Sequence, residues 1–312
     1  MGYSFEELEP FVATLKNTKF EGDLCLFISK TNKKTYRMLR KYGIKLIPFQ
    51  EEYPFTLDLA IPEGLLDENL SSRKISVKYL RYILYYLYLS KYRSKYSKVL
   101  ITDVKDVIFQ RNPFAFNFDK GLCCFIEDSS TTIKTSPFNS GRIKAHFGDE
   151  LLEKIGDNHP LCSGTTFGYL SEMMEYLKKM INLFSKINLD GGGDQGLHNY
   201  LIYTEPFKDL KIYNGDYGPV FTFGSKLNRN TNFNKDGLLV SSKGKVFNIV
   251  HQYDRHPELF EKFFKRQHLN LPLNYLLRLY FLGRNRFEDT VGWDFFNRLG
   301  WKFVNRLGLK IK

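Results

Sequence analysis

Cysteine and tryptophan are scarce in this chain. Its 312 residues include only 4 cysteines and 2 tryptophans. Cys123 and Cys124 are adjacent on a predicted strand, so their thiols would point to opposite faces of a sheet. No two cysteines have the CxxC spacing of zinc sites and redox motifs. The sequence therefore indicates neither a disulfide framework nor a zinc site, and a reducing compartment fits it best.

Long apolar runs are also missing. The most apolar stretch, YLRYILYYLYLS at residues 79–90, is too short to span a bilayer and contains Arg81. It predicts a buried helix instead. The chain shows no basic leader followed by an apolar run, no internal repeat and no long low-complexity linker. We therefore expect a cytoplasmic protein.

Aromatic and basic residues are abundant. The chain has 28 Phe and 20 Tyr, and its 46 basic and 34 acidic residues give a net charge of +12. This excess suggests an anionic partner, which could be nucleic acid, a lipid surface or a phosphorylated ligand. Hydrophobic content of 43% and charged content of 26% are ordinary for a globular protein. The length suits one large domain, or one domain with a tail.

Strand and helix patterns alternate up to about residue 130, which predicts an α/β fold with a mostly parallel central sheet and helices on both faces. Ser4 and Glu7 predict a capping box at the first helix. Further helices are expected at 32–43, 73–92, 171–187 and 194–203. Strands are expected at 23–29, 44–49, 98–102, 121–127 and 163–169, and shorter ones near 211–214, 220–223 and 245–250. A polar, mobile segment is expected between residue 127 and about His159.

The stretch VLITDVKDVIFQRNPF, residues 99–114, ends an apolar strand in Asp103 and places Asp106 in the following turn. Ligands of open α/β sheets bind at the carboxyl ends of strands. Two carboxylates this close resist joint ionisation unless a cation or strong donors compensate. Because Mg²⁺ or Mn²⁺ is held by such carboxylates together with substrate phosphates, the pair suggests a metal-bridged diphosphate site. Alternatively, Asp103 caps a turn and Asp106 pairs with Lys105 or Arg111 on the surface.

Two glycine-containing stretches carry candidate substrate contacts. LCSGTTFG, residues 161–168, places Gly164 beside small hydroxyl residues, where a sugar or phosphate could approach the backbone. LDGGGDQGLHNY, residues 189–200, places Asp194 and Gln195 at a helix start, where they could orient hydroxyl groups. The structural alternatives are a glycine needed for packing and an N-cap after a flexible loop.

The late stretch FNIVHQYDRHP, residues 247–257, ends an apolar strand in His251. A single histidine in such a place is more often structural than a ligand. Its value as a candidate therefore depends on the other stretches.

Together, TDVKDVIFQRNPF, CSGTTFG, the helix start with DQ, and HQYDR resemble the nucleotide-sugar-dependent glycosyltransferases of the GT-A fold, over roughly residues 2–260. The resemblance implies a Rossmann-type sheet in which Asp103 and Asp106 stand in for the "DXD" metal motif and His251 is the third ligand of Mn²⁺ or Mg²⁺. Two residues rather than one separate the acids here. Asp106 is favoured as the direct ligand, with Asp103 a second ligand or a ribose contact.

The resemblance also implies that Asp194 and Gln195 are the catalytic pair facing the donor sugar and the acceptor. Arg81 matches a basic position that contacts the nucleotide or phosphate of the donor. The alternative for Arg81 is a side chain that snorkels from a buried helix to solvent. Gly164 is expected to lie against the bound donor.

The activity implied is transfer of a sugar from a nucleoside diphosphate sugar to a hydroxyl of a glycan or lipid-linked glycan, with retention favoured. Such domains open with a strand that touches the nucleotide base, whereas this sequence enters its first capping box almost directly. We expect that strand to be missing through truncation, another mode of base binding, or loss of donor binding. The alternatives are an inactive carbohydrate-binding relative and a nucleic-acid-binding protein, although the basic residues are dispersed and form no recognition motif.

The expected organisation is a GT-A-like domain at 1–260 and a helical extension at 261–312. The extension combines basic and aromatic residues at near-helical spacing. It could lie on an anionic membrane surface and bring the protein to membrane-bound acceptors. Alternatively, it forms a helical pair packed on the domain.

Overall fold

The structure is a computed structural model, and it describes residues 3–29, 31–49, 75–187, 193–215, 217–224 and 232–255. The chain divides into two units, Met1–His256 and Pro257–Lys312, and the described residues all belong to the first. The helical extension expected at 261–312 lies outside the described residues.

The first part of the chain alternates helices and strands, as expected. In chain order the elements are α1 (Phe5–Asn17), β1 (Cys25–Ile28), α2 (Lys33–Lys41), β2 (Lys45–Pro48), α4 (Val77–Lys91), β3 (Lys98–Thr102), β4 (Val107–Phe109) and β5 (Leu122–Phe125). The capping box is confirmed: Glu7 N donates to Ser4 Oγ at 3.4 Å, and Ser4 N donates to Glu7 Oε2 at 3.0 Å. The strand β4 was not expected, since no strand was predicted between residues 102 and 121.

The second part continues with α5 (Pro137–Ile155), β6 (Thr165–Tyr169), α6 (Leu170–Ser185), α7 (Gly193–Thr204), β7 (Lys211–Tyr213), β8 (Val220–Thr222), β9 (Asn232–Phe233), β10 (Leu239–Val240) and β11 (Ile249–His251). The expectation of a mobile segment up to His159 is wrong, since α5 occupies most of it. Ser136 caps this helix, and Pro137 occupies its first turn, where a missing N–H costs nothing. The helix was not predicted because most of its residues are polar. Only part of one face is buried, so few apolar residues are needed.

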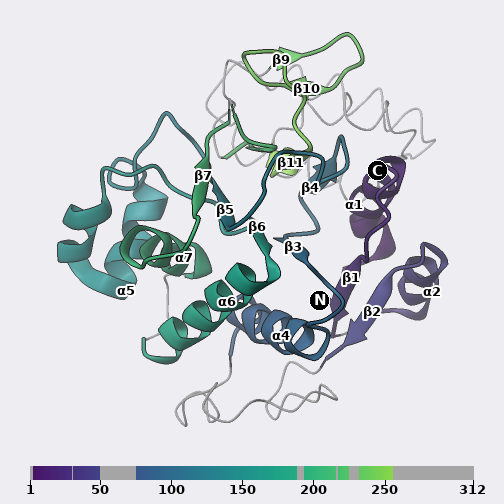
Figure 1. The fold of residues 1–312 in the computed structure, drawn as a ribbon, viewed down its shortest axis with the longest axis horizontal. Coiled ribbons are helices and arrows are strands. Elements are labelled where there is room, and N and C mark those ends of the chain that lie inside the picture. The colour runs from purple at the N-terminus through teal and green to yellow at the C-terminus, as the bar shows by residue number, and fades with distance from the viewer. Residues whose placement is uncertain are drawn as a thin grey trace, which may run out of the picture. The chain divides into compact units, whose positions relative to one another are not determined.

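The strands form mixed sheets (Figure 1). The largest has four strands in the order β3-β6-β5-β7, and a second has three in the order β4-β11-β8. Strand β6 runs antiparallel to both β3 and β5, while β7 is parallel to β5. The pair β1–β2 is parallel. The fold is thus α/β with parallel and antiparallel pairs, and the expectation of a mostly parallel sheet is wrong for the described strands.

The reversal of β6 follows from where the chain re-enters the sheet. After β5 the chain leaves the sheet and returns to the same end of it, because Glu127 N donates to Pro160 O at 2.8 Å and Cys162 N donates to Phe125 O at 3.0 Å. The excursion that contains α5 therefore begins and ends at one edge. A chain that re-enters a sheet where it left must run in the opposite direction.

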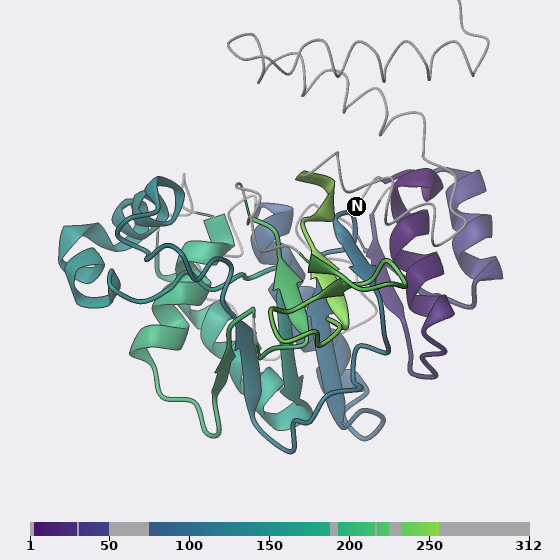
Figure 2. The same ribbon diagram turned by 90° about the horizontal axis from the view of Figure 1, so that it is seen from above.

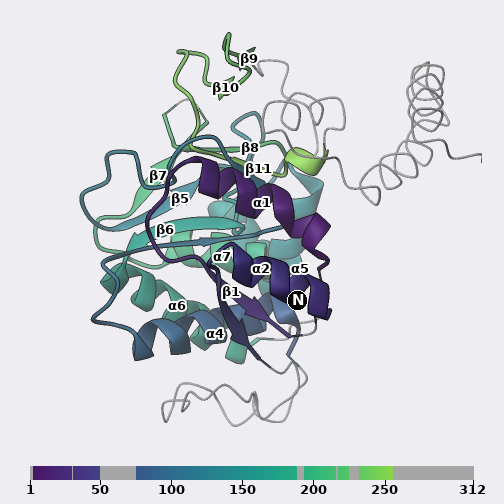
Figure 3. The ribbon, with the colours of Figure 1, turned by 90° about the vertical axis from the view of Figure 1, so that its right-hand side faces the viewer.

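Helices cover both faces of the four-stranded sheet, as expected. In Figure 3, α4 and α6 lie on one side of it and α1 on the other. The adjacent cysteines of β5 separate accordingly: Cys124 joins the core formed with α4, α6 and α7, and Cys123 joins the core beneath α1. Both thiols are free and buried, which confirms that they point to opposite faces.

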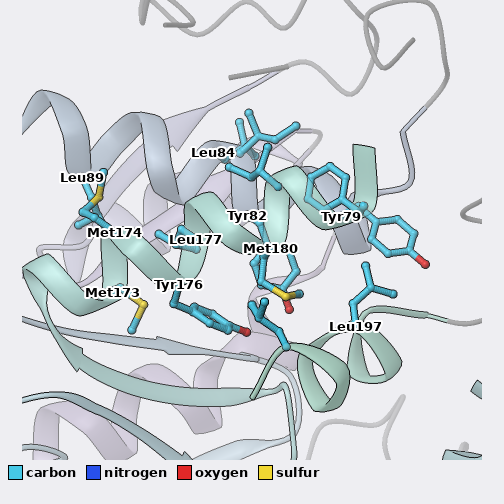
Figure 4. Close-up of a cluster of buried hydrophobic side chains, with 14 of the residues drawn as sticks. Tyr79, Tyr82, Leu84, Leu89, Met173, Met174, Tyr176, Leu177, Met180 and Leu197 are labelled. Atoms are coloured by element: carbon cyan, nitrogen blue, oxygen red, sulfur yellow. The ribbon is translucent and has the colours of Figure 1, made fainter. Parts of the chain in front are cut away.

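The tyrosine-rich stretch is a buried helix, as predicted. Leu80, Ile83 and Leu84 of α4 are no more than 1% exposed. Figure 4 shows α4 packed along α6, with Met180 and Leu177 among the contacting side chains. Burying a side chain of this size contributes roughly 1.5–3 kcal/mol, so the helix is a major source of stability. Within the part of the chain that the structure describes, no helix combines the length and apolar character that a membrane span requires.

Strands β1 and β3 each have one edge without a partner strand among the described residues. Strand β3 is the edge of its sheet, and β1 pairs only with β2. A cavity of about 490 Å³ is lined by residues of both strands, together with Phe11 of α1 and Tyr85 of α4. Figure 2 shows α1 and α2 side by side next to the β1–β2 pair. Among the described residues, α1 is the first element.

Candidate metal site

The candidate residues lie close together at the ends of strands that belong to two different sheets. Asp103 follows β3, and its N–H donates to Gly164 O at 2.8 Å, which fixes it beside the start of β6. His251 is the last residue of β11, opposite Val107 at the start of β4. The next residue, Gln252, donates its N–H to Asp106 O at 2.7 Å. Pairing of β11 with β4 thus brings a residue from the end of the described chain to the turn between β3 and β4.

Asp103, Asp106 and His251 converge on one point. Nε2 of His251 lies 3.6 Å from Asp103 Oδ2 and 3.6 Å from Asp106 Oδ1. One ligand atom from each residue lies within 4.8 Å of the others, so the group could hold a metal ion. Two atoms that each bind one divalent ion at roughly 2.0–2.2 Å are roughly 2.8–3.6 Å apart at octahedral or tetrahedral angles. The predicted convergence of the three residues is confirmed.

The histidine ring is oriented for coordination. Nε2 of His251 is buried and has no hydrogen-bond partner among the described residues. On the other side of the ring, Cys162 Sγ lies 3.3 Å from Nδ1. A partner on one ring nitrogen fixes the orientation in which the other can bind a metal. Sequence reasoning did not select Cys162, although it directly precedes the SG of the glycine stretch.

Gly164 leaves the space that His251 and Asp103 occupy. A Cβ atom at this position would lie 2.5 Å from His251 Cε1 and 2.6 Å from Asp103 Oδ2. Real Cβ atoms do not come this close, so a side chain here would displace the imidazole or the carboxylate. The glycine is therefore needed by the site, and its predicted contact with a donor stays a prediction.

The pKa values of the two carboxylates of the site, Asp103 and Asp106, are shifted in opposite directions. For Asp103, burial raises the pKa, but the Arg81 guanidinium and His251 outweigh it and lower the pKa below its ordinary value. For Asp106, burial raises the pKa, and His251 offsets this only in part while the charge of Asp103 adds to it. Burial opposes a charge on His251, yet Cys162 and the two aspartates raise its pKa well above the ordinary value. The negative charge around His251 that favours a proton on the ring would also favour a bound cation in place of that proton.

Arg81 connects the metal candidates to the second motif. Its Nη1 donates to Asp103 Oδ1 at 2.6 Å, and its Nη2 donates to Asp194 Oδ2. The same Asp194 oxygen accepts from Tyr82 OH at 3.0 Å. The head group lies between two carboxylates and its side chain is only 21% exposed, so the snorkelling alternative is wrong. Its predicted contact with the donor stays a prediction.

Asp194 and Gln195 are buried at the start of α7. The amide Nε2 of Gln195 donates to Glu127 Oε2 at 2.7 Å and to Asn139 Oδ1 at 2.8 Å. In this structure both side chains are thus held by the chain itself, and their contact with a donor sugar and an acceptor stays a prediction. Sequence reasoning missed Glu127 and Asn139. Glu127 could have been found, since it lies two residues beyond the end of β5, close to a strand end as Asp103 is.

The surface alternative for the two acids does not describe the structure. Lys105 Nζ lies 3.1 Å from Glu7 Oε1, and Asp106 faces His251. The side chains of the two acids are 36% and 21% exposed, and both lie beside a buried histidine. Turn capping and surface pairing do not require such a cluster.

Substitution of Gly164 by alanine is expected to weaken Mn²⁺ binding about tenfold or more, because the added methyl group occupies the space between Asp103 and His251. Calorimetric titration with Mn²⁺ measures this. Gly141→Ala is the matched control, since a Cβ there meets nothing within 4 Å. Equal Mn²⁺ affinity in Gly164→Ala and the unmodified protein would contradict this account of the glycine.

Comparison with known proteins adds no relative. No protein-family model matches the chain, and no curated protein matches it.

Proposed function

We propose that the described unit is a metal-dependent glycosyltransferase. It would move a sugar from a nucleoside diphosphate sugar to a hydroxyl of a glycan or glycolipid acceptor. The observation that carries this proposal is the meeting of Asp103, Asp106 and His251 at the carboxyl end of β3. The resemblance of their motifs to GT-A glycosyltransferases supplies the reaction class. Helices on both faces of the sheet support a GT-A-like, Rossmann-type arrangement as the finer description of the fold.

The donor atoms suit Mn²⁺ or Mg²⁺. Carboxylate oxygens are the ligands that hard divalent ions prefer, and an imidazole nitrogen favours Mn²⁺ of the two. The fit is supported by the orphaned Nε2 of His251 and by the space at Gly164. When bound there, the ion would neutralise charge on a leaving diphosphate as a Lewis acid.

The remaining residues of the site would orient the substrate and take no part in the chemical step. Arg81 holds the carboxylates of Asp103 and Asp194 at a fixed separation through both ends of its guanidinium. Glu127 and Asn139 fix the amide of Gln195. Groups held by such networks orient a substrate without loss of conformational freedom during the reaction. The resemblance favours retention of configuration.

A second candidate function is that of an inactive relative that binds the nucleotide sugar. One observation favours it: the side chains of Asp194 and Gln195 are engaged by Arg81, Tyr82 and Glu127. In an active enzyme these side chains would exchange some of these bonds for bonds to substrate. In an inactive binder they would keep them.

A panel of nucleoside diphosphate sugars tests the proposal. The protein is incubated with each sugar and Mn²⁺, and hydrolysis of the donor is measured together with the heat of binding. We expect hydrolysis of at least one donor, and its loss when a chelator removes Mn²⁺. Heat without hydrolysis would favour the inactive relative. Neither heat nor hydrolysis with any donor would contradict both.

A further inference from the structure

Arg142 of α5 forms no ion pair with any described residue, although Asp194 and Glu127 lie near enough for their charges to act on it. It is half-buried, and its guanidinium makes no hydrogen bond within the described ranges and lies over an aromatic ring. A guanidinium has five N–H donors, and burying a charge without a partner is costly. Burial lowers the pKa of Arg142 below its ordinary value, although the charges of Asp194 and Glu127 oppose this shift. A cation in such a position is expected to bind an anionic ligand.

The guanidinium of Arg142 packs against the Phe138 ring and the start of α7. It lies 3.6 Å above the centre of the Phe138 ring, one turn earlier on α5. Towards α7, a Cβ on Gly193 would lie 3.4 Å from Arg142 Cζ, and a Cβ on Gly196 would lie 3.2 Å from Arg142 Cβ. The two glycines at the start of α7 thus leave room for the side chain. A guanidinium stacked on a ring keeps the N–H groups in its plane free to bind an anion.

The position of Arg142 is linked to the candidate metal site through Asn139 and Asp194. Asn139, three residues before Arg142, accepts from Gln195 Nε2 at 2.8 Å. Between Gly193 and Gln195 lies Asp194, which Arg81 joins to Asp103. Arg142 therefore borders the same group of side chains from the α5 side.

The charged side chains of this group leave a bound diphosphate without a counter-charge, which Arg142 supplies. Asp103, Asp106 and Asp194 are three carboxylates, and Arg81 is paired with two of them. A divalent ion together with Arg81 offsets these three negative charges, and Glu127 is a further carboxylate of the same network, so no positive charge remains for a bound diphosphate. A further cation beside the site would attract the diphosphate, and arginine binds phosphate oxygens with two parallel hydrogen bonds.

We propose that Arg142 binds the diphosphate group of the substrate that occupies the Asp103–Asp106–His251 site. This inference rests on the proposed function. Phe138 and the glycines at the start of α7 position the guanidinium, and its free N–H groups donate to phosphate oxygens.

Calorimetry with inorganic pyrophosphate tests this. The unmodified protein and Arg142→Met are titrated first with Mg²⁺ alone, then with pyrophosphate in saturating Mg²⁺. We expect pyrophosphate to bind Arg142→Met at least about tenfold more weakly, with Mg²⁺ affinity unchanged. Arg142→Lys should recover only part of the loss, because lysine restores the charge but not the two parallel donors. Arg93→Met, at an exposed arginine, is the matched control and should bind as the unmodified protein does.

Phe138→Leu is a second variant that keeps the charge. Because Phe138 is 56% exposed, its loss should not prevent folding, and it should weaken pyrophosphate binding about threefold by releasing the guanidinium. Equal pyrophosphate affinity in the unmodified protein and in folded Arg142→Met would overturn this inference alone. Absence of Mg²⁺ and pyrophosphate binding in the unmodified protein would overturn the proposed function as well.

Discussion

Replacement of Asp106 by asparagine is expected to lower Mn²⁺-dependent hydrolysis of the donor sugar by at least about 100-fold. Asparagine keeps the size of the side chain but removes the negative charge that faces His251 Nε2 at 3.6 Å. Loss of a charged ligand weakens the ion's hold, and the charge on the leaving diphosphate is then less well neutralised. The rate is measured at saturating donor over a range of Mn²⁺ concentrations.

The control for this variant is Asp119→Asn. Asp119 is an exposed aspartate that pairs with Lys211 at 3.2 Å, away from the metal candidates. It should leave the rate unchanged. The pKa of Asp106 is already raised by burial, so a neutral residue there should not destabilise the fold, and thermal unfolding checks this. Full activity in folded Asp106→Asn would remove Asp106 from the metal site.

Replacement of Arg81 by methionine is expected to lower the free energy of unfolding by about 3 kcal/mol. Methionine fills a similar volume, but it leaves Asp103 and Asp194 without the cation that joins them. The cost lies at the low end for a buried pair because Asp103 keeps 36% of its side chain exposed. Urea unfolding, followed by circular dichroism, measures the change.

Two further variants separate charge from packing at this position. Arg81→Met combined with Asp194→Asn should recover part of the lost stability, since one uncompensated carboxylate is removed. Arg93→Met, at an exposed arginine, should change stability by no more than about 0.5 kcal/mol. A loss below about 1 kcal/mol in Arg81→Met would show that the two aspartates do not depend on Arg81.

Local features of the fold followed from local sequence. The capping box of Ser4 and Glu7, the strand that ends at Thr102, and the opposite burial of Cys123 and Cys124 were all predictable. Each depends on a few neighbouring residues, through backbone hydrogen bonds or the two-residue period of a strand. The helix α5 was missed because its sequence is mostly polar and only a few of its residues are buried.

The meeting of Asp103 and Asp106 with His251 could be predicted only from the motif resemblance. No spacing rule joins residues about 150 positions apart. The structure brings them together because β11 pairs antiparallel with β4.

The sequence by itself determined where strands end and which side chains those ends carry, including Asp103 and His251. Tertiary structure alone decided the direction of β6, the bridge from Arg81 to two aspartates, and the seat of Arg142 on Phe138. The physical reason is range: caps and strand periodicity act over a few residues, whereas these pairings depend on which distant surfaces pack together. The charge of a side chain is fixed by its type, but its partner is fixed only by the fold.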